Sequence, residues 1–582
     1  MPKPNLHSFI ALLLAALTGA AFSQDRRNIY HGSEIPSAGY ADMPLVVTLN
    51  DGSWLCVMTT GPGEEGNVGQ HIVATRSSDQ GQTWSDLVAI EPSIKKPGHE
   101  SSWVVPFHVE HQGNSEFGRV YAFYVHNGDR ITEVPGREDE LRFRVDTLGW
   151  YMYRHSDDGG ATWSEPTRID IPMTWADVNN TFKGEAQMFW GVDEPIAVDG
   201  RLLIAFTKIR RHLVGSTEGW VLESSNLLTE SDPSKHGWRL LSNGQTGDSK
   251  NWRGLRSETN FAGTQAEHDI TKLSEPGKLM MMNRTDKGVI SVSWSSDGGE
   301  TWTEPESATY ADGSPIRNPR ANTKVWTIEP GKYLLWFHNH GGTDFNNRNP
   351  GWVSAGIEHD GKILWSQPEI LLYGNDPKTR ISYPDLIVED GRCFITETQK
   401  SVARAHEVDP SLIEGLFMQL DQVPTPPTDS IERPDTISLH EGGGFSISAV
   451  VQDGKNEPGT TIAESNAGFG INCILKWHGI DRVSVEMRFN RTEFTWLSDP
   501  IAVDTDGPHH IVLTIDGGPR LLTFTINGKL QDGAGQRQYG WARIPDEFDQ
   551  ISLSPSARDG VVVFDRPLTT SEAIELFEAS RR

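Results

Sequence analysis

One eight-residue pattern, Ser-x-Asp-x-Gly-x-Thr-Trp, occurs three times in this chain and constrains its fold more than any other feature. The copies, which we call boxes, begin at Ser77, Ser156 and Ser295. An Asp two residues before a Gly suits a tight turn, because its carboxylate accepts backbone N–H bonds and Gly adopts the positive φ that other residues resist. Each box follows a run typical of a strand, such as residues 71–75 or 289–294. We therefore expect every box to staple a hairpin, with its Trp anchoring the turn by burial.

The spacing of the boxes indicates a repeated unit. The second and third boxes, at residues 156 and 295, stand about twice as far apart as the first two, so one degenerate copy fits between them, and residues 223–238 are the candidate. A weaker copy at residues 358–365 keeps the Asp, the Gly and the Trp. A period of roughly 60 to 80 residues from residue 30 to residue 420 predicts six blades of a β-propeller, an all-β fold. Such turns lie on the outer rim, so we interpret the boxes as structural.

Three intact boxes in a predicted propeller resemble the sialidase (neuraminidase) superfamily, and the resemblance covers roughly residues 28–420. Similar boxes also occur in propellers that are not enzymes. Any inference of activity therefore depends on whether the residues of the sialidase site can be found at their expected places.

Five residues match the order of that site. The family places a Glu before a strand, a turn and an Arg that precedes a box, and the resemblance implies that Glu267 and Arg284 take these places. It assigns a further clamp arginine to Arg348, and the catalytic tyrosine to Tyr383, which opens Tyr-Pro-Asp-Leu where the family has Tyr-Ser-x-Leu. Glu397, at the end of the following strand, matches the family's Glu that orients the first clamp arginine.

The chemistry that the resemblance implies explains why these residue types occur together. A sialic acid carries a carboxylate on its anomeric carbon, so an anionic nucleophile would be repelled, whereas a neutral phenol avoids that repulsion. Tyr383 would attack as its proton passes to Glu267, an exception to the usual scheme with two carboxylates. Arginines would hold the substrate carboxylate, because the planar guanidinium offers paired donors and stays charged.

Two departures from the family pattern concern the first blade. Sialidases begin it with Phe/Tyr-Arg-Ile-Pro, whereas residues 40–44 read Tyr-Ala-Asp-Met-Pro, so Asp42 stands where the first clamp arginine is expected. An anion there should repel a substrate carboxylate. The family's acid/base Asp is also missing upstream of the first box. Glu64, Glu65 and Asp42 are the candidates for the acid, and an acidic surface turn is the alternative interpretation of Glu64 and Glu65.

Other polar residues suit a rebuilt pocket for a sugar. Arg320, with Arg317 near it, enters the predicted fifth blade, and His338 and His340 leave the next strand on the same inferred face. We count Arg320 and His338 among the candidate substrate-binding residues. Without a nearby Cys or a third spaced His, we expect no metal site, and no cofactor is implied. Trp190 could line the pocket from the third blade or belong to the core.

The ends and the charge of the chain suggest where it acts. Residues 1–23 combine a basic start, an apolar stretch and small residues before a cleavage point near Ser23, which predicts a signal peptide and a secreted or periplasmic protein. The formal net charge is −27, so nucleic acid and anionic membranes are poor partners. No later segment approaches a transmembrane run, so we expect no insertion into a membrane. Cys56 and Cys393 fall in the predicted first and last blades, where either a closing disulfide or two free thiols would fit. The oligomeric state stays open.

The composition changes after residue 420 of the 582-residue chain. We predict the propeller over residues 24–420, a proline-rich linker over 421–436 and a β-sandwich over 437–582. Short alternating strands, an Asn-Gly turn at 527–528 and a final short helix resemble the laminin-G/concanavalin-like family. Such domains bind carbohydrate or pack on a partner domain, and a purely structural appendage is the alternative.

Two classes of function follow from these observations. The first is a secreted, sialidase-like exo-glycosidase that hydrolyses a terminal sugar with retention, with sialic acid or another glycan residue as substrate. The second is a glycan-binding propeller that has lost part of the sialidase site, which the missing first arginine and the unplaced acid favour.

Overall fold

The computed structural model describes residues 24–135, 140–211, 217–257, 259, 261, 264–421, 426–430, 436–451, 461–464, 472–478, 481–489, 491–501, 508–552 and 560–581. The predicted signal peptide and most of the predicted linker lie outside these residues. No helix within the described ranges is both long enough and apolar enough to cross a membrane.

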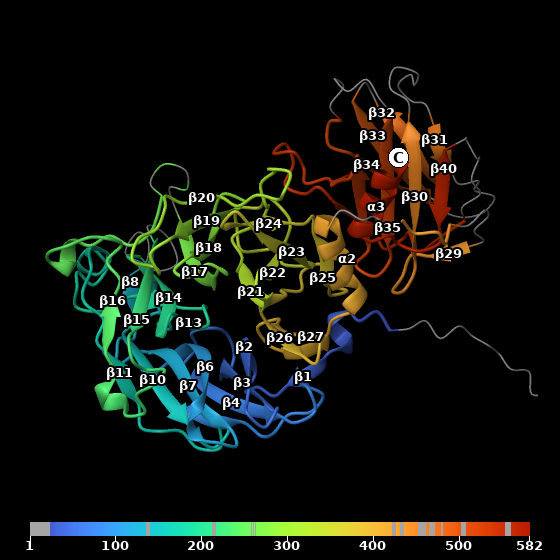
Figure 1. Ribbon diagram of the computed structural model, residues 1–582. Coiled ribbons are helices and arrows are strands. Elements are labelled where there is room, and N and C mark those ends of the chain that lie inside the picture. Colours follow the sequence, from blue (N-terminus) through green and yellow to red (C-terminus); the bar gives the residue numbers. More distant parts are fainter. Residues whose placement is uncertain are drawn as a thin grey trace, which may run out of the picture.

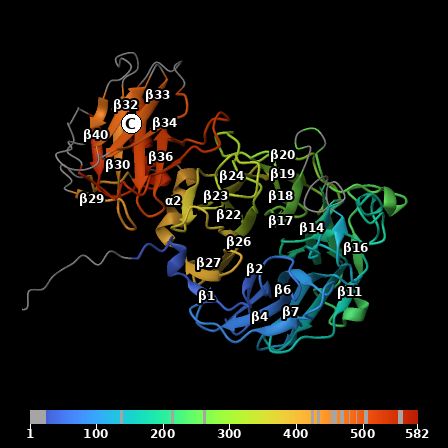
Figure 2. The same cartoon turned by 180° about the vertical axis from the view of Figure 1, so that it is seen from behind.

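Six antiparallel sheets follow one another along the chain and form a ring, which confirms the predicted all-β propeller (Figures 1 and 2). The first blade contains β2 (Tyr40–Thr48), β3 (Trp54–Gly61), β4 (His71–Ser77) and β5 (Val88–Glu91). The second contains β6 (Ser101–Asn114), β7 (Gly118–His126), β10 (Trp150–Ser156) and β11 (Thr167–Ile169). The third contains β12 (Phe189–Trp190), β13 (Ile196–Val198), β14 (Arg201–Ile209), β15 (Thr217–Ser224) and β16 (Trp238–Leu240). A small hairpin of β8 (Val134–Pro135) and β9 (Leu141–Arg142) and the short helix α1 (Trp175–Val178) lie in the connections.

The last three blades complete the ring. The fourth blade contains β17 (Gln265–Lys272), β18 (Leu279–Thr285), β19 (Ile290–Ser295) and β20 (Glu306–Ser307). The fifth contains β21 (Lys324–Glu329), β22 (Lys332–Phe337), β23 (Gly351–His359), β24 (Lys362–Trp365) and β25 (Glu369–Leu372). The sixth contains β26 (Ser382–Glu389), β27 (Arg392–Thr398) and β28 (Ala403–Glu407). The N-terminal strand β1 (Ser33–Ile35) pairs with β28 and becomes the outer strand of the sixth blade. The two ends of the propeller are therefore joined in one sheet.

Buried carboxylates in or beside the innermost strands tie each of three blades to the next one. Asp193 accepts a hydrogen bond from the backbone N–H of Ile270 at 3.3 Å, and Asp269 accepts one from Val325 at 3.0 Å. Asp385 accepts the N–H of Val46 at 2.7 Å, which closes the ring between the sixth and first blades. These bonds satisfy inner-strand N–H groups that no strand of the neighbouring blade could reach.

The three boxes connect the third strand of a blade to its fourth, at the ends of β4, β10 and β19. The degenerate copy at 223–238 connects β15 to β16, and the weaker copy at 358–365 connects β23 to β24. Each predicted copy therefore occupies the same place in its blade. The Trp side chains of the boxes are half-buried rather than fully buried, because each packs on the rim of the core and not inside it.

Cys56 and Cys393 are free thiols, so no disulfide joins the first and last blades. One element was not expected from the sequence. The helix α2 (Pro410–Asp421) follows the last blade and buries Leu412 and Leu416 against β23 and its neighbours. The propeller thus passes into a helix before the proline-rich segment begins.

The C-terminal strands form two facing sheets around one apolar core, a β-sandwich. Its elements are β29 (Thr436–Ser438), β30 (Gly444–Val451), β31 (Thr461–Glu464), β32 (Asn472–His478), β33 (Arg482–Phe489), β34 (Thr492–Leu497), β35 (His509–Asp516), β36 (Leu521–Ile526), β37 (Lys529–Leu530), β38 (Ala542–Arg543), β39 (Gln550–Ser552), β40 (Val561–Phe564) and helix α3 (Thr570–Ser580). Its membership in the laminin-G/concanavalin-like family stays a prediction.

Candidate active site

A cavity of about 140 Å³ opens among the innermost strands of the propeller. Its lining comes from several blades: Glu65, Trp103, Arg144, Thr147, Trp190, Glu267, Arg284, Arg320, Phe345, Arg348, Arg380 and Tyr383. Six of the ten candidate residues named from the sequence lie in this lining, namely Glu65, Glu267, Arg284, Arg320, Arg348 and Tyr383, whereas Glu64 does not. Residues from distant parts of the chain therefore meet in one pocket.

The same backbone device places Glu267 and Tyr383. The pairing register shifts between Ala266 and Asp269 in β17, and between Ser382 and Asp385 in β26. Within these bulges φ is +57° at Glu267 and +46° at Tyr383. A β-bulge re-aims a side chain, and a non-glycine residue in the left-handed region is strained unless its surroundings hold it. Both side chains are thereby turned toward the pocket.

Two further blades carry a bulge at the matching place. The register shifts after Asp42 in β2 and after Ser102 in β6, with φ of +54° at Met43 and +58° at Trp103. Trp103 lines the pocket and packs edge-on against the ring of Tyr383, with ring centroids 6.4 Å apart. The propeller thus repeats one strained position, and the residue type found there differs from blade to blade.

Tyr383, Glu267 and Arg284 form a connected group. The phenol Oη of Tyr383 donates a hydrogen bond to Oε1 of Glu267 at 2.9 Å, and Nη1 of Arg284 lies 2.9 Å from the same oxygen. Only 6% of Tyr383 and 1% of Glu267 is exposed. Burial and the charge of Glu267 raise the pKa of Tyr383 above its usual value, against the opposing effect of Arg284 and Arg348. The phenol is therefore neutral and its proton already points at a carboxylate.

The arginines on the opposite wall have fewer acidic partners. Arg348 donates from Nη1 to Oγ of Ser382 at 3.1 Å and from Nη2 to the carbonyl of Arg320 at 3.3 Å. Among the described residues, no carboxylate forms an ion pair with Arg348 or Arg380. Burial and the nearby Arg284 lower the pKa of Arg320 to about 10. This wall offers cationic donors to an anionic ligand.

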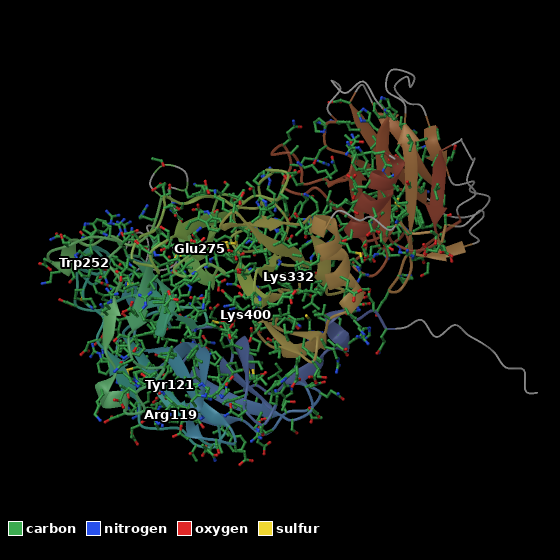
Figure 3. The ribbon with its side chains drawn as sticks, viewed as in Figure 1. Arg119, Tyr121, Trp252, Glu275, Lys332 and Lys400 are labelled. Carbon is green, nitrogen blue, oxygen red and sulfur yellow. The ribbon has the colours of Figure 1, made fainter. Side chains whose placement is uncertain are left out.

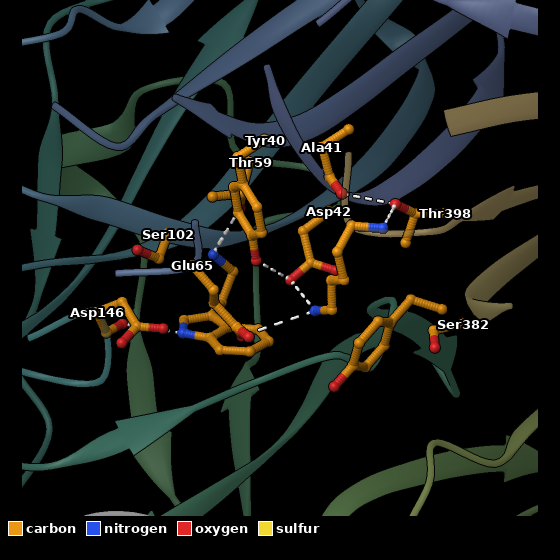
Figure 4. Close-up of polar contacts among 12 residues, drawn as sticks. Tyr40, Ala41, Asp42, Thr59, Glu65, Ser102, Asp146, Ser382 and Thr398 are labelled. Carbon is orange, nitrogen blue, oxygen red and sulfur yellow. Dashed lines mark hydrogen bonds and ion pairs between the residues drawn. The ribbon is translucent and has the colours of Figure 1, made fainter. Parts of the chain in front are cut away.

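The acidic candidates Asp42 and Glu65 lie beside one lysine (Figure 4). Asp42 accepts hydrogen bonds from Oη of Tyr40 and from Nζ of Lys400, both at 2.6 Å. Glu65 lies 3.7 Å from the same Nζ and accepts a bond from Nη2 of Arg144 at 2.7 Å. Asp42 is 1% exposed and stands behind the lining rather than in it.

The two carboxyl groups differ in pKa. Burial raises the pKa of Asp42, with Lys400 acting in the opposite direction. Burial also acts to raise the pKa of Glu65. The charges of Arg144, Lys400 and nearby arginines outweigh this effect and lower the pKa of Glu65 to about 2. Glu65 is therefore ionised in the free pocket, and Asp42 holds a proton more readily.

Glu397 and His338 also lie outside the pocket lining. Glu397 accepts a bond from Nε2 of Gln399 at 2.9 Å and lies 3.4 Å from Nε2 of His406. The first clamp arginine that a Glu at this place would orient is absent, because Asp42 stands there. The ring of His338 is buried against Trp336, and its Nδ1 lies 3.1 Å from the carbonyl of Pro350. Neither side chain contacts the space where a ligand would bind.

Several pocket residues were not found from the sequence. Arg144, Arg380 and Lys400 lie in connections between strands and follow no recognisable pattern, and Trp103 reads as an ordinary strand residue. Trp190, left open between core and pocket, belongs to the lining. A signal for Lys400 did exist, because an inward Asp42 in place of a cation requires a new positive partner.

Comparison with known proteins gives one family match. Residues 118–395 match the model of the BNR repeat-like domain. Among solved structures, a Trypanosoma rangeli sialidase in complex with 2,3-difluorosialic acid as a covalent intermediate is 14% identical, with a TM-score of 0.45, over 96% of this chain and 97% of its own. A Hadza microbial sialidase is 20% identical, with a TM-score of 0.43, over 65% of this chain and 68% of its own.

A protein of unknown function from Dyadobacter fermentans is 15% identical, with a TM-score of 0.45, over 65% of this chain and 97% of its own. The match begins at the second strand of the second blade and ends within the sixth blade, and it includes two of the three boxes. Residues 118–395 are therefore similar to BNR repeat-like domains, in keeping with the boxes at the ends of the third strands.

Proposed function

We propose that this protein is a retaining exo-glycosidase that removes a terminal acidic sugar, with Tyr383 as nucleophile and Glu267 as its base. One observation carries the proposal: the phenol of Tyr383 donates a hydrogen bond to Glu267 at 2.9 Å inside a pocket lined by arginines. A nucleophile bonded to a base that a third group orients is the usual arrangement of covalent catalysis. A small pocket suits the end of a glycan rather than its middle.

The reaction has two steps. Oη of Tyr383 attacks the anomeric carbon while its proton passes to Oε1 of Glu267, and the bond from that carbon to the leaving-group oxygen breaks. The leaving oxygen takes a proton from the acid. Water then attacks the same carbon from the opposite face and gives a proton back to that acid, while the phenol recovers its proton from Glu267. Two inversions at one carbon give net retention.

An anionic sugar is favoured by the wall of Arg320, Arg348 and Arg380. Arg348 and Arg380 lack carboxylate partners among the described residues, and guanidinium groups bind a carboxylate through paired donors. A bound anion would also reduce the positive field that holds the pKa of Glu65 at about 2. We propose that Glu65 then carries the proton for the leaving group and that Asp42, with its raised pKa, shares it.

The decisive experiment replaces the nucleophile. The Tyr383→Phe variant should lose hydrolysis of terminal sugars by a factor on the order of 10³ or more, while its affinity for the sugar changes little. A panel of chromogenic glycosides with acidic and neutral terminal sugars gives the rates, and titration calorimetry with the free sugar gives the affinity. The control is Tyr333→Phe, whose phenol bonds Glu358 outside the pocket.

The outcome separates the two classes of function. If the unaltered protein binds an acidic sugar but hydrolyses no glycoside of the panel, the glycan-binding propeller is the correct interpretation, and the loss of the first clamp arginine at Asp42 is its cause. If Tyr383→Phe retains hydrolysis, the assignment of the nucleophile is wrong.

Secretion belongs to the same proposal. A glycosidase for terminal sugars of glycoconjugates would meet its substrate outside the cytoplasm, and residues 1–23 have the composition of a signal peptide. Amino-terminal sequencing of the protein recovered from the producing cell checks this. A mature chain that starts near Gln24 supports secretion, and one that still starts at residue 1 contradicts it.

A further inference from the structure

Lys400 occupies a position that the proposed reaction has not used. Its Nζ lies 2.6 Å from Oδ2 of Asp42 and 3.7 Å from Oε1 of Glu65. The same ammonium lies 4.3 Å from the centroid of the Tyr383 ring, and at 6.0 Å and 5.8 Å from the rings of Trp103 and Tyr40. Figure 3 shows Lys400 near the middle of the propeller, whereas Arg119 and Trp252 lie toward its edge.

The backbone holds Lys400 in a strained conformation to achieve this. Its φ is +74°, in the region that favours glycine. The N–H of Lys400 donates to Oγ1 of Thr398 at 2.8 Å, and its carbonyl accepts the N–H of Ala41 at 3.0 Å. The turn between β27 and β28 is therefore fastened to the first blade. A lysine kept where glycine would be easier indicates that the side chain itself is needed.

We propose that Lys400 is a positioning residue for the reaction: its ammonium, anchored by Asp42, lies over the Tyr383 ring and stabilises the negative charge that develops there as the phenolic proton moves to Glu267. This inference rests on the proposed function. A cation over an aromatic face is attracted by the electron-rich ring, and more strongly when the ring gains charge. Lys400, in the last blade, would thus supply the cation that position 42, in the first blade, lacks.

Charged groups face Tyr383 from every side, and their balance decides the effect. Glu267 on β17 and Asp42 on β2 disfavour a phenolate. Arg284 on β18, the Arg320 and Arg348 connections and Lys400 favour one. Lys400 differs from Arg348, whose Cζ lies 5.9 Å from the same centroid, because it is closer to the ring and stands outside the pocket lining. A substrate bound at the arginine wall would therefore not neutralise it. Its contribution therefore persists when an anionic sugar is bound.

The simpler alternative is that Lys400 only neutralises the buried Asp42. A double variant separates the two roles, because removing one partner of a buried pair leaves an uncompensated charge, whereas removing both does not. Lys400→Met should reduce kcat roughly 10- to 30-fold with a smaller change in KM. Because Asp42 is itself proposed to share the proton of the acid, Asp42→Asn alone is the reference. Lys400→Met combined with Asp42→Asn should recover the thermal stability of the protein, and its kcat should stay below that of Asp42→Asn. Lys400→Arg should recover part of the kcat.

A second readout does not depend on turnover. Replacing Tyr383 by 3-nitrotyrosine gives a more acidic phenol whose ionisation is followed by visible absorbance. In the Lys400→Met background the midpoint of this titration should lie about one pH unit above its value in the otherwise unaltered protein. The exposed control Lys362→Met should leave the midpoint unchanged. If the protein hydrolyses no sugar, the proposed function fails, yet this titration still tests the contact.

Two results would overturn the inference. One is a double variant with the same kcat as Asp42→Asn alone, which would reduce Lys400 to a counter-ion for Asp42. The other is a nitrotyrosine midpoint that does not move when Lys400 is replaced, in a variant whose melting temperature shows that it is folded.

Discussion

Positive side chains gather in the pocket although the chain carries a formal net charge of −27. Five arginines of the described chain line the cavity, and their charges are only partly matched by Glu65 and Glu267. Buried guanidinium groups without acidic partners are costly, so a protein retains them where a ligand supplies the missing charge. The excess is therefore a property of the binding site and not of the surface as a whole.

Arg380 provides a test of this at the level of one residue. Arg380→Met should raise KM for an acidic terminal sugar about tenfold and change kcat less, since one charged contact to the substrate is lost. The amide of the same sugar should be bound equally by both proteins. Arg488→Met in the sandwich, where the side chain is 57% exposed, is the matched control. An equal loss for acid and amide would show that Arg380 shapes the pocket without recognising the charge.

The sequence identified the residues that sit within motifs and missed those that do not. Tyr383 and Glu267 follow family patterns and meet in the structure. Lys400 lies 358 residues from Asp42, and nothing local marks a lysine in a turn as part of a pocket. Glu397 illustrates the converse, because its predicted contact depended on an arginine that this chain has replaced.

At the scale of the element, each box is the same small network of hydrogen bonds. In the second box, Oδ1 of Asp158 accepts the N–H of Thr162 at 2.9 Å and the hydroxyl of Ser156 at 2.8 Å. Asp79 and Asp297 repeat these bonds within their own boxes. The position of the boxes could be predicted because the carboxylate, the Gly and the Thr all act within one turn.

Replacing the carboxylate of one box should affect stability and leave chemistry unchanged. Asp158→Ala removes the acceptor for several bonds of a half-buried turn, which should lower the free energy of unfolding by about 1 to 3 kcal/mol. Urea unfolding measures that loss, and kcat and KM measured well below the new midpoint should match wild type. A large fall in kcat would mean that the rim of the propeller communicates with the pocket.

The bulges of the innermost strands could not be predicted in the same way. Their residues, such as Trp103 and Tyr383, belong to no common sequence pattern, and only the pairing of β6 and β26 with their neighbours reveals the shared register shift. The strain is held by long-range bonds, for example from the N–H of Glu267 to Oγ1 of Thr207 at 2.9 Å. The residues around a bulge do not predict a conformation that depends on hydrogen bonds from another blade.

At the scale of the whole molecule, the sandwich packs on the loop that carries part of the pocket. Nε1 of Trp541 donates to the carbonyl of Asn339 at 3.0 Å, and Nη2 of Arg543 donates to that of Asn349 at 2.6 Å. Arg348 lies between these two anchored points in the chain. The second domain therefore braces the arginine wall by packing on the propeller, which is one of the roles considered from the sequence.

His340 makes this contact sensitive to acid. It packs on the ring of Tyr539, with centroids 4.8 Å apart, its Nε2 lies 2.8 Å from the carbonyl of Asn347, and its Nδ1 accepts the N–H of Gly342 at 3.1 Å. A proton on Nδ1 would make this nitrogen a donor that faces the N–H of Gly342, so the hydrogen bond between them would be lost. Burial lowers the pKa of His340 to about 4, against an unfolded value of 6.5, although the bond to Asn347 acts to raise it.

The unfolded chain thus binds this proton more tightly than the folded protein does. The stability that His340 contributes is complete above pH 6.5 and is lost as the pH falls toward 4, by on the order of 3 kcal/mol. Thermal unfolding of His340→Gln should therefore depend less steeply on pH than wild type between pH 6.5 and 4. The exposed His359→Gln should behave as wild type. His340 stands between the sandwich and the Arg348 loop. As the pH falls from 6.5 to 4, KM for an acidic sugar should therefore rise in wild type and stay level in His340→Gln. Parallel pH profiles of KM for the two proteins would show that the second domain does not support the pocket.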